Sequence, residues 1–231
     1  MGAMRQTVLG ILAACLLTLA TACSVATKDP DYVPPPPLPP LEQIKQVPVT
    51  QPSELGTSEE LIAFVTADRN IVCAMTSAKG NHLNLPYEAN NYGDSANGKL
   101  ATVPVVHCEL AVYPAPQAKD IADNCSGTRL GYLGGTVLLT PDKVSYGNCR
   151  SGVTEMEAEF GPKGTRAGAI AELPILQEGL NIERNGLRCS AYNGGVGCGN
   201  ISAGVAFFVN RGGYMLVSEG GTVTSGKMPP S

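Results

Sequence analysis

The chain is short of the residues on which many catalytic, metal-binding and nucleic-acid-binding proteins depend. It contains no tryptophan, two histidines and 16% charged residues in 231 positions. Its formal net charge is −4 and no stretch gathers lysine and arginine, so we expect no nucleic-acid partner. No Cys-x-x-Cys pair is present, which argues against a structural zinc site. By contrast, 27 glycines and 18 prolines favour short strands joined by turns over long helices.

The first 23 residues have the layout of an export signal. Arg5 supplies a positive charge near the start, and residues 7–22 are uncharged and apolar or small, as in a signal peptide. The stretch ends in Ala20-Thr21-Ala22-Cys23, which resembles a bacterial lipobox. The resemblance implies that residues 1–22 are removed and that Cys23 is lipidated, holding the mature protein on the outer face of the cell membrane. Two or three acyl chains attach a protein stably, whereas one holds it only marginally.

Two alternatives to lipidation at Cys23 stay open in the sequence. Leu12-Ala13-Ala14-Cys15 also fits a lipobox, but cleavage there leaves a very short apolar run before the cysteine. Residues 7–23 are also just long enough for an uncleaved transmembrane helix. We favour Cys23 on these length arguments. Removal of residues 1–22 would leave 15 basic and 20 acidic residues, a formal charge of −5.

Composition divides the rest of the chain into three segments. Residues 23–59 contain the lipidated cysteine and a Pro-rich disordered stalk with nine of the 18 prolines. Such a stretch adopts extended polyproline II and acts as a spacer that adds nothing to a core; a ligand for a Pro-binding domain is the alternative. Within it, residues 41–46 suggest at most a turn of helix. We expect a disulfide-stapled β domain over residues 60–220 and a flexible tail over residues 221–231.

Apolar and β-branched runs separated by turn residues predict an all-β fold, mainly antiparallel, arranged as a sandwich or a small barrel. The predicted strands and hairpins are residues 61–65, 71–75, 103–112, 136–140 with 144–146, and 205–209 with 214–218. Helix is expected only briefly, in residues 116–124 and 154–160.

Six cysteines follow the lipobox, an even number that predicts three disulfides in an exported chain. They are Cys73, Cys108, Cys125, Cys149, Cys189 and Cys198. Because six cysteines allow 15 pairings, counting alone selects none of them.

A short internal echo bears on the pairing. Residues 68–73 (DRNIVC) resemble residues 183–189 (ERNGLRC), and each is followed by a strand that carries another cysteine. The last two cysteines also flank Asn193-Gly194, the strongest short hairpin signal, and a hairpin brings such positions within disulfide distance. If the echo is an internal repeat rather than a chance similarity, the pairs are Cys73–Cys108, Cys189–Cys198 and, by elimination, Cys125–Cys149.

Five short segments carry a resemblance to a known family. They are FVTADRNIVC at residues 64–73, VHCEL at 106–110, LPILQEG at 173–179, GLRC at 186–189 and GVGCGN at 195–200. These segments resemble a family of small secreted actinobacterial proteins of unknown function. The chain departs at Ala67-Asp68-Arg69, where the family has Pro-Ser-Gly, and at Ala203-Gly204-Val205, where it has Gly-His-Gly. The resemblance supports the disulfide framework and implies no activity.

No catalytic constellation is recognisable, and we predict no catalytic residue, cofactor or metal. His107 adjoins a disulfide cysteine, without a serine elbow or an orienting acid. Glu155, Glu157 and Glu159 alternate as on the polar face of a strand. The segment at residues 94–98 (DSANG) lacks the remaining acidic ligands of a calcium loop.

The segment Lys79–Lys99 is the candidate binding loop. It holds His82, which we expect to be solvated, together with Tyr87, Asn91 and Tyr92. A long loop on a rigid scaffold often carries binding, and tyrosine with asparagine and glycine is typical of adaptable binding surfaces. A tolerated insertion without function is the alternative.

These patterns together predict a membrane-anchored, non-enzymatic envelope lipoprotein whose β domain binds another envelope protein or a glycan. An enzyme acting on cell-wall or glycolipid substrates is one alternative, and a structural subunit of an envelope complex is another. A pocket that joins a histidine to two carboxylates would favour the enzyme. An exposed aromatic patch would favour binding.

Overall fold

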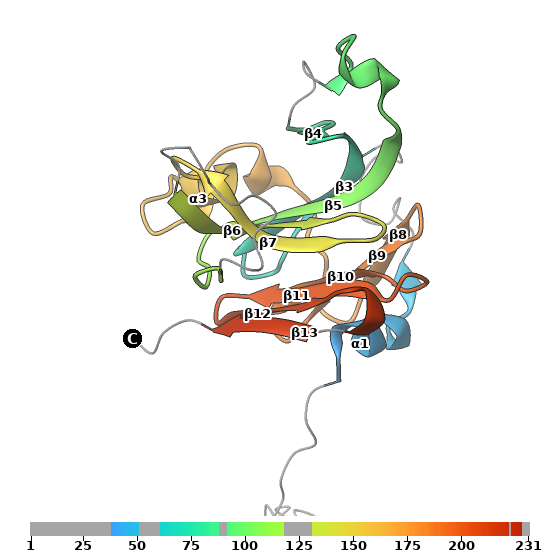
Figure 1. The fold of residues 1–231 in the computed structure, drawn as a ribbon. Coiled ribbons are helices and arrows are strands. Elements are labelled where there is room, and N and C mark those ends of the chain that lie inside the picture. Colours follow the sequence, from blue (N-terminus) through green and yellow to red (C-terminus); the bar gives the residue numbers. More distant parts are fainter. Residues whose placement is uncertain (1–37, 51–60, 88–91, 118–130, 222, 228–231) are drawn as a thin grey trace, which may run out of the picture. The chain divides into compact units, whose positions relative to one another are not determined.

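The computed structural model describes residues 38–50, 61–87, 92–117, 131–221 and 223–227, which form two β-sheets (Figure 1). The first sheet contains β2 (Ile62–Val65), β3 (Ile71–Lys79), β4 (His82–Leu83), β5 (Thr102–Leu110), β6 (Gly131–Leu139) and β7 (Val144–Arg150). The second contains β1 (Val49–Thr50), β8 (Asn181–Arg184), β9 (Leu187–Tyr192), β10 (Gly195–Asn200), β11 (Val205–Asn210), β12 (Gly213–Val217) and β13 (Val223–Lys227). The helices are α1 (Pro40–Gln46) and α3 (Glu155–Phe160), with short 3₁₀ turns η2 (Asn97–Lys99), η4 (Ile170–Glu172) and η5 (Glu219–Gly221).

Apart from β1 and β4, the strands of each sheet lie side by side in the order in which they occur along the chain. The first sheet has the order β2-β3-β5-β6-β7, with β4 paired to β3, and the second has the order β1-β8-β9-β10-β11-β12-β13. Among the strand pairs of the described residues, only β1 with β8 is parallel. The predicted all-β, mainly antiparallel fold is therefore confirmed.

Alternation along each strand decides which side chains enter the core between the sheets. On β3, Ile71, Cys73 and Met75 belong to the shared core, whereas Val72 belongs to a separate cluster on the outer face. Paired residues form a buried row across each sheet: Phe64, Cys73, Cys108, Val137 and Tyr146 in the first, and Ile182, Cys189, Cys198, Phe207 and Leu216 in the second. The two rows pack into one apolar cluster, so the sheets form a sandwich.

Five strands of each sheet follow the same plan. We call β2, β3, β5, β6 and β7 the first meander, and β8 to β12 the second meander. In each, the strands pair in chain order and a disulfide joins the second strand to the third. The turn before the second strand contains a residue with positive φ in both, Arg69 (51°) and Asn185 (50°). The echo between residues 68–73 and 183–189 therefore has a counterpart in the topology.

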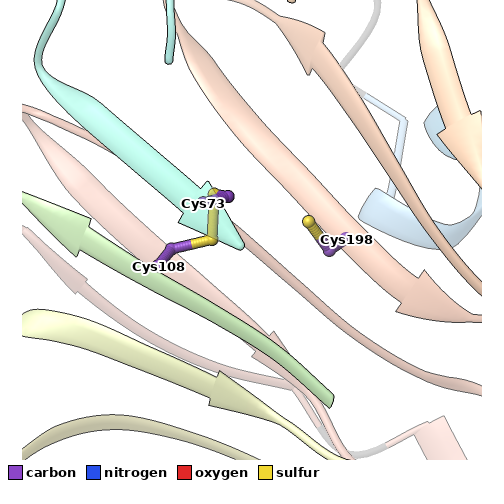
Figure 2. Close-up of side chains that lie close together, drawn as sticks. All are labelled: Cys73, Cys108 and Cys198. Carbon is purple, nitrogen blue, oxygen red and sulfur yellow. A yellow bond between two sulfur atoms is a disulfide. The ribbon is translucent and has the colours of Figure 1, made fainter. Parts of the chain in front are cut away.

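The two described disulfides face each other across the core. Cys73–Cys108 and Cys189–Cys198 join directly opposed residues of neighbouring strands, with Cα atoms 4.1 and 4.0 Å apart. Figure 2 shows the sulfur of Cys198 pointing toward the Cys73–Cys108 bond. Both predicted pairs are confirmed.

The predicted hairpins form where the turn residues indicated them. Asn193 and Gly194 have φ values of 51° and 65°, as a type I′ turn between β9 and β10 requires. The other two predicted hairpins are β6 with β7 and β11 with β12.

The prediction that residues 23–59 add nothing to a core is wrong for residues 38–50. Pro40 occupies the first turn of α1, where a missing N–H does no harm. Ile44 is fully buried in this helix, which packs on β10 and β11 (Figure 1). The Ile44 carbonyl also accepts a hydrogen bond of 2.8 Å from the side-chain amide of Asn181. The folded unit thus begins at Leu38 rather than near residue 60.

The C-terminal segment is partly ordered as a strand. β13 pairs with β12, so the prediction of a flexible tail over residues 221–231 is wrong for residues 223–227.

The predicted helix at residues 154–160 is confirmed as α3. Thr154 caps it, because its hydroxyl accepts a hydrogen bond of 3.1 Å from the Glu157 N–H.

Some predicted features lie outside the described residues. They are the signal segment with Cys23, much of the Pro-rich stalk, Asn91, most of the predicted helix at 116–124, and Cys125. Cys149, the predicted partner of Cys125, is disulfide-bonded. Within the described part of the chain, no helix is long and apolar enough to span a membrane.

Candidate functional site

Two short helical elements, α3 and η4, cover part of the outer face of the first sheet. Val65 and Val72 from the sheet meet Met156 of α3 and Ile170 of η4 in a small buried cluster. The capping box at Thr154 begins α3 at the position from which Met156 reaches this cluster. The first meander thus has a second, smaller core on the face that points away from the disulfides.

A pocket of about 120 Å³ adjoins this second core. Ala63 on β2 and Ala74 on β3 are directly paired, and their small side chains leave space above the sheet. We call this cavity the Glu109 pocket. Its lining residues are Leu61, Ala63, Val72, Ala74, Pro86, Tyr87, Glu109, Glu155, Ala169, Ile170 and Leu173.

Glu109 is the buried acid of the pocket, with 7% of its surface exposed. Its Oε2 accepts a hydrogen bond of 3.1 Å from the Met156 N–H in the first turn of α3, and its Oε1 lies 3.5 Å from His107 Nε2. Burial alone would raise the pKa of Glu109, but hydrogen bonds from His107, the Met156 N–H and Thr154 outweigh it and hold the pKa below its ordinary 4.5. The carboxylate is therefore ionised at neutral pH and ties α3 to β5.

Tyr87 forms an aromatic wall of the pocket. Its ring packs edge-on against the His107 ring, with centroids 4.6 Å apart. Desolvation by burial, followed by the negative charges of Glu109 and Glu155, raises the pKa of Tyr87 well above its ordinary value. The phenol therefore stays protonated at neutral pH beside both carboxylates. Glu155 itself is exposed, so the second acid lies at the solvent side of the pocket.

The described lining of the pocket combines apolar side chains with two carboxylates, Glu109 and Glu155, and the ring of Tyr87. His107 adjoins the pocket through Tyr87 and Glu109 rather than lining it. Small apolar cavities with a few convergent polar groups are typical of ligand sites.

The residues of the predicted binding loop lie in different surroundings in the structure. Tyr87 lines the pocket, whereas the Tyr92 hydroxyl lies 2.8 Å from Ser77 Oγ and the Tyr92 ring lies under the Lys79 ammonium, 5.1 Å from the ring centroid. Both tyrosines are half-buried. His82 is half-buried in β4, paired with β3, so its assignment to a solvated loop is wrong.

The three alternating glutamates do not share one face of a strand, and that prediction is wrong. They lie in α3, where residues two apart point in different directions. Glu155 lines the pocket, Glu157 forms an ion pair of 2.7 Å with Arg150, and Glu159 accepts a hydrogen bond of 3.4 Å from the Ile170 N–H. The capping box overrides the apparent period of two.

Two groups among the described residues resemble metal sites but stabilise the fold instead. Asp94 accepts a hydrogen bond of 2.7 Å from the Asn97 N–H at the start of η2, which accounts for the calcium-like spacing. The sulfur atoms of Cys73, Cys108 and Cys198 lie within 4.8 Å of one another. These sulfurs belong to the disulfides Cys73–Cys108, drawn in Figure 2, and Cys189–Cys198, and are not thiolates that bind metal.

The pocket itself could not be found from local sequence patterns. Glu109 entered only as part of a family-like motif, and Ala63, Ala74 and Ile170 carried no signal of their own. Two alanines on neighbouring strands indicate a cavity only once the strand register is known. Ile170 lies almost 100 residues from β3 along the chain, and no local pattern links the two.

The chain matches no protein-family model, no curated protein and no solved structure. The resemblance to a secreted actinobacterial family therefore stays an expectation that rests on its short motifs.

Proposed function

We propose that the chain is an exported lipoprotein, anchored at the outer face of the cell membrane through Cys23, whose β domain binds another envelope component without catalysis. The Glu109 pocket is the observation that carries the binding part. Export is supported by the signal-like residues 1–22. It is also supported by the pairs Cys73–Cys108 and Cys189–Cys198, since disulfides form and persist in oxidising compartments.

The anchor is tested by metabolic labelling with a fatty-acid probe. Cys23→Ser should leave an unlabelled precursor, whereas Cys15→Ser, the matched control in the rival lipobox, should be labelled like the natural chain. Label that persists on the Cys23→Ser chain would overturn the anchoring proposal.

The pocket is tested by cross-linking in the intact envelope. A photoreactive side chain at Ala169, which is exposed and lines the pocket, should capture a defined envelope component. The same side chain at Ala158, which is exposed on α3 but lies outside the pocket lining, is the control. Ala74→Leu should fill the cavity and abolish capture at position 169, with circular dichroism confirming that the domain still folds. Equal capture at both positions, or capture that survives Ala74→Leu, would remove the pocket from the proposal.

One contact favours the enzyme as a second candidate. His107 and Glu109 form a close pair at 3.5 Å beside a pocket that also contains Glu155. A proton-transfer role would require the His107 imidazole, whereas a binding role would need only the shape of the pocket. Loss of function of the His107→Gln chain in its own bacterium, with capture at position 169 retained, would favour the enzyme. Retained function would favour binding alone.

A further inference from the structure

We infer that the Glu109 pocket takes the side chain of a lysine displayed by a partner protein. This rests on the proposed function, because it assigns the chemistry of the group that enters the pocket. A lysine side chain has a flexible apolar stem that ends in a compact ammonium group with three donors. Each part of that side chain has a counterpart in the lining.

The size and walls of the pocket match the stem. A volume of about 120 Å³ lies well below the roughly 300–1,000 Å³ typical of drug-sized ligand sites. Ala63, Val72, Ala74, Ile170 and Leu173 supply an apolar surface along which methylene groups bury while the charged end stays near polar groups.

The charges of the pocket match the ammonium end. Glu109 is buried, and the described residues place no lysine or arginine nitrogen within ion-pairing distance of its carboxylate, whose Oε1 lies 3.5 Å from His107 Nε2. Glu155 adds a second carboxylate at the solvent side, and Tyr87 adds an aromatic ring beside both acids. A cation over an aromatic face gains further electrostatic attraction.

The same contacts favour an ammonium over other cations. Arginine recognition uses a carboxylate with both oxygens free for a planar, two-bond contact. At Glu109, Oε2 accepts the Met156 N–H and Oε1 faces His107, so the remaining lone pairs suit a single-point contact with a compact ammonium better than a planar two-bond contact. A zwitterionic lipid headgroup would bring a phosphate toward two carboxylates, which repel it. Exposed apolar side chains at Leu85, before the lining residue Pro86, and Val153, before α3, are instead suited to a protein surface.

The test is a titration of the full chain, purified in detergent, with small probes followed by NMR. The probes are the peptide acetyl-Gly-Lys-Gly-amide, the same peptide with its lysine acetylated, n-butylamine and n-butanol. The lysine peptide and n-butylamine should shift the amide signals of Ala74, Glu109 and Ile170, and the two neutral probes should bind much more weakly.

Variants sharpen this titration. Glu155→Gln should weaken binding of the lysine peptide about two- to fivefold, as loss of an exposed ion pair would. Glu219→Gln, which removes an exposed acid on η5 in the second sheet, should change nothing. Tyr87→Leu should weaken binding about two- to fivefold, whereas Tyr87→Phe, which keeps the ring, should bind like the natural chain. Because Glu155 and Glu219 are exposed, these variants should fold normally.

The outcomes separate the inference from the function on which it rests. If the acetylated peptide or n-butanol binds as tightly as the charged probes, the cationic ligand is overturned while the pocket remains a binding site. If n-butylamine binds and the lysine peptide does not, the protein source is overturned. If no probe binds and capture at position 169 also fails, the proposed function itself is overturned.

Discussion

The two meanders differ at two positions of their third strand. In the first meander, His107 and Glu109 flank the disulfide cysteine of β5 and point to the outer face. In the second meander, Gly197 and Gly199 hold the same places on β10. The strand order, the disulfide position and the buried row are otherwise shared.

Because Gly197 and Gly199 have no side chains, other residues can pack directly on the outer face of the second meander. The Tyr192 ring lies directly over Gly197 and stacks on Phe208 with centroids 4.8 Å apart. Leu41 of α1 lies close to Gly199. In the first meander, Glu109 instead fixes α3 through a hydrogen bond and leaves a cavity beside it. One disulfide-bonded scaffold thus forms a closed surface or a pocket, depending on the outward side chains of its third strand.

Removing each disulfide in turn should give the largest difference in stability between the two meanders. Cys73–Cys108 spans 35 residues and Cys189–Cys198 spans 9, so loop-closure entropy predicts losses of about 4 and about 2.5 kcal/mol of unfolding free energy. The paired Cys→Ala variants, compared by urea denaturation, measure the difference. Equal losses, or a larger loss in the second meander, would show that the two disulfides do not act through loop length.

Gly199→Ala should break the closed surface of the second meander. A Cβ there would lie 2.9 Å from the Ala206 Cβ and 3.0 Å from the Val205 carbonyl oxygen, so strand or helix must shift. Overpacking of this kind costs about 1–3 kcal/mol. Gly212→Ala is the control, because its Cβ would meet nothing closer than Asn210 Oδ1 at 3.7 Å. The measurement is the Tm of each variant by thermal denaturation. Equal decreases in Tm for both variants would contradict the close packing at Gly199.

Glu109→Gln should change the pH dependence of stability in the first meander. The folded-state pKa of Glu109 lies below its ordinary 4.5, so the ionised form stabilises the fold above that pH and this contribution is lost as the pH falls below it. The variant should therefore be about 1 kcal/mol less stable at neutral pH, and the two curves should converge in acid. Asp68, whose pKa is also lowered, leaves some acid sensitivity in both chains. Parallel curves across the whole pH range would mean that Glu109 is not stabilised as an anion.

Tyr92→Phe should leave peptide binding unchanged and distinguishes the two ends of the candidate loop. The change removes the hydroxyl that lies 2.8 Å from Ser77 Oγ, which is worth about 0.5–1.5 kcal/mol net. Binding of the lysine peptide should not change, because Tyr92 lies outside the pocket lining. A weakened peptide affinity in this variant would extend the site beyond Tyr87.

The strands were predictable because their signals are local. The run of residues 71–75 and the Asn193-Gly194 turn each specify their own conformation, and the turn also places its flanking cysteines. The beginning of the domain was not predictable in this way. Ile44 is one of several scattered apolar residues in a Pro-rich stretch, and it becomes core only because Asn181 and β10 lie beside it.

The candidate site could not be predicted either, because its residues come from elements that are distant along the chain. Tyr87 was singled out for its residue type, but its partners Glu109 and Glu155 come from β5 and α3. The glutamates of α3 were interpreted by their alternation, although Thr154 and Glu157 had the spacing of a capping box. The helix over residues 154–160 was predicted, but the three glutamates within it were assigned to one face as if the segment were a strand.

The docking of α1 and β1 also bears on how the protein would respond to tension. A pull transmitted along the chain from an N-terminal anchor reaches these two elements first, and the two described disulfides lie beyond them. α1 is held by the burial of Ile44 and β1 by a two-residue pair with β8. Because both disulfides lie beyond α1 and β1 along the chain, detaching these two elements would leave Cys73–Cys108 and Cys189–Cys198 holding the second and third strands of each meander together.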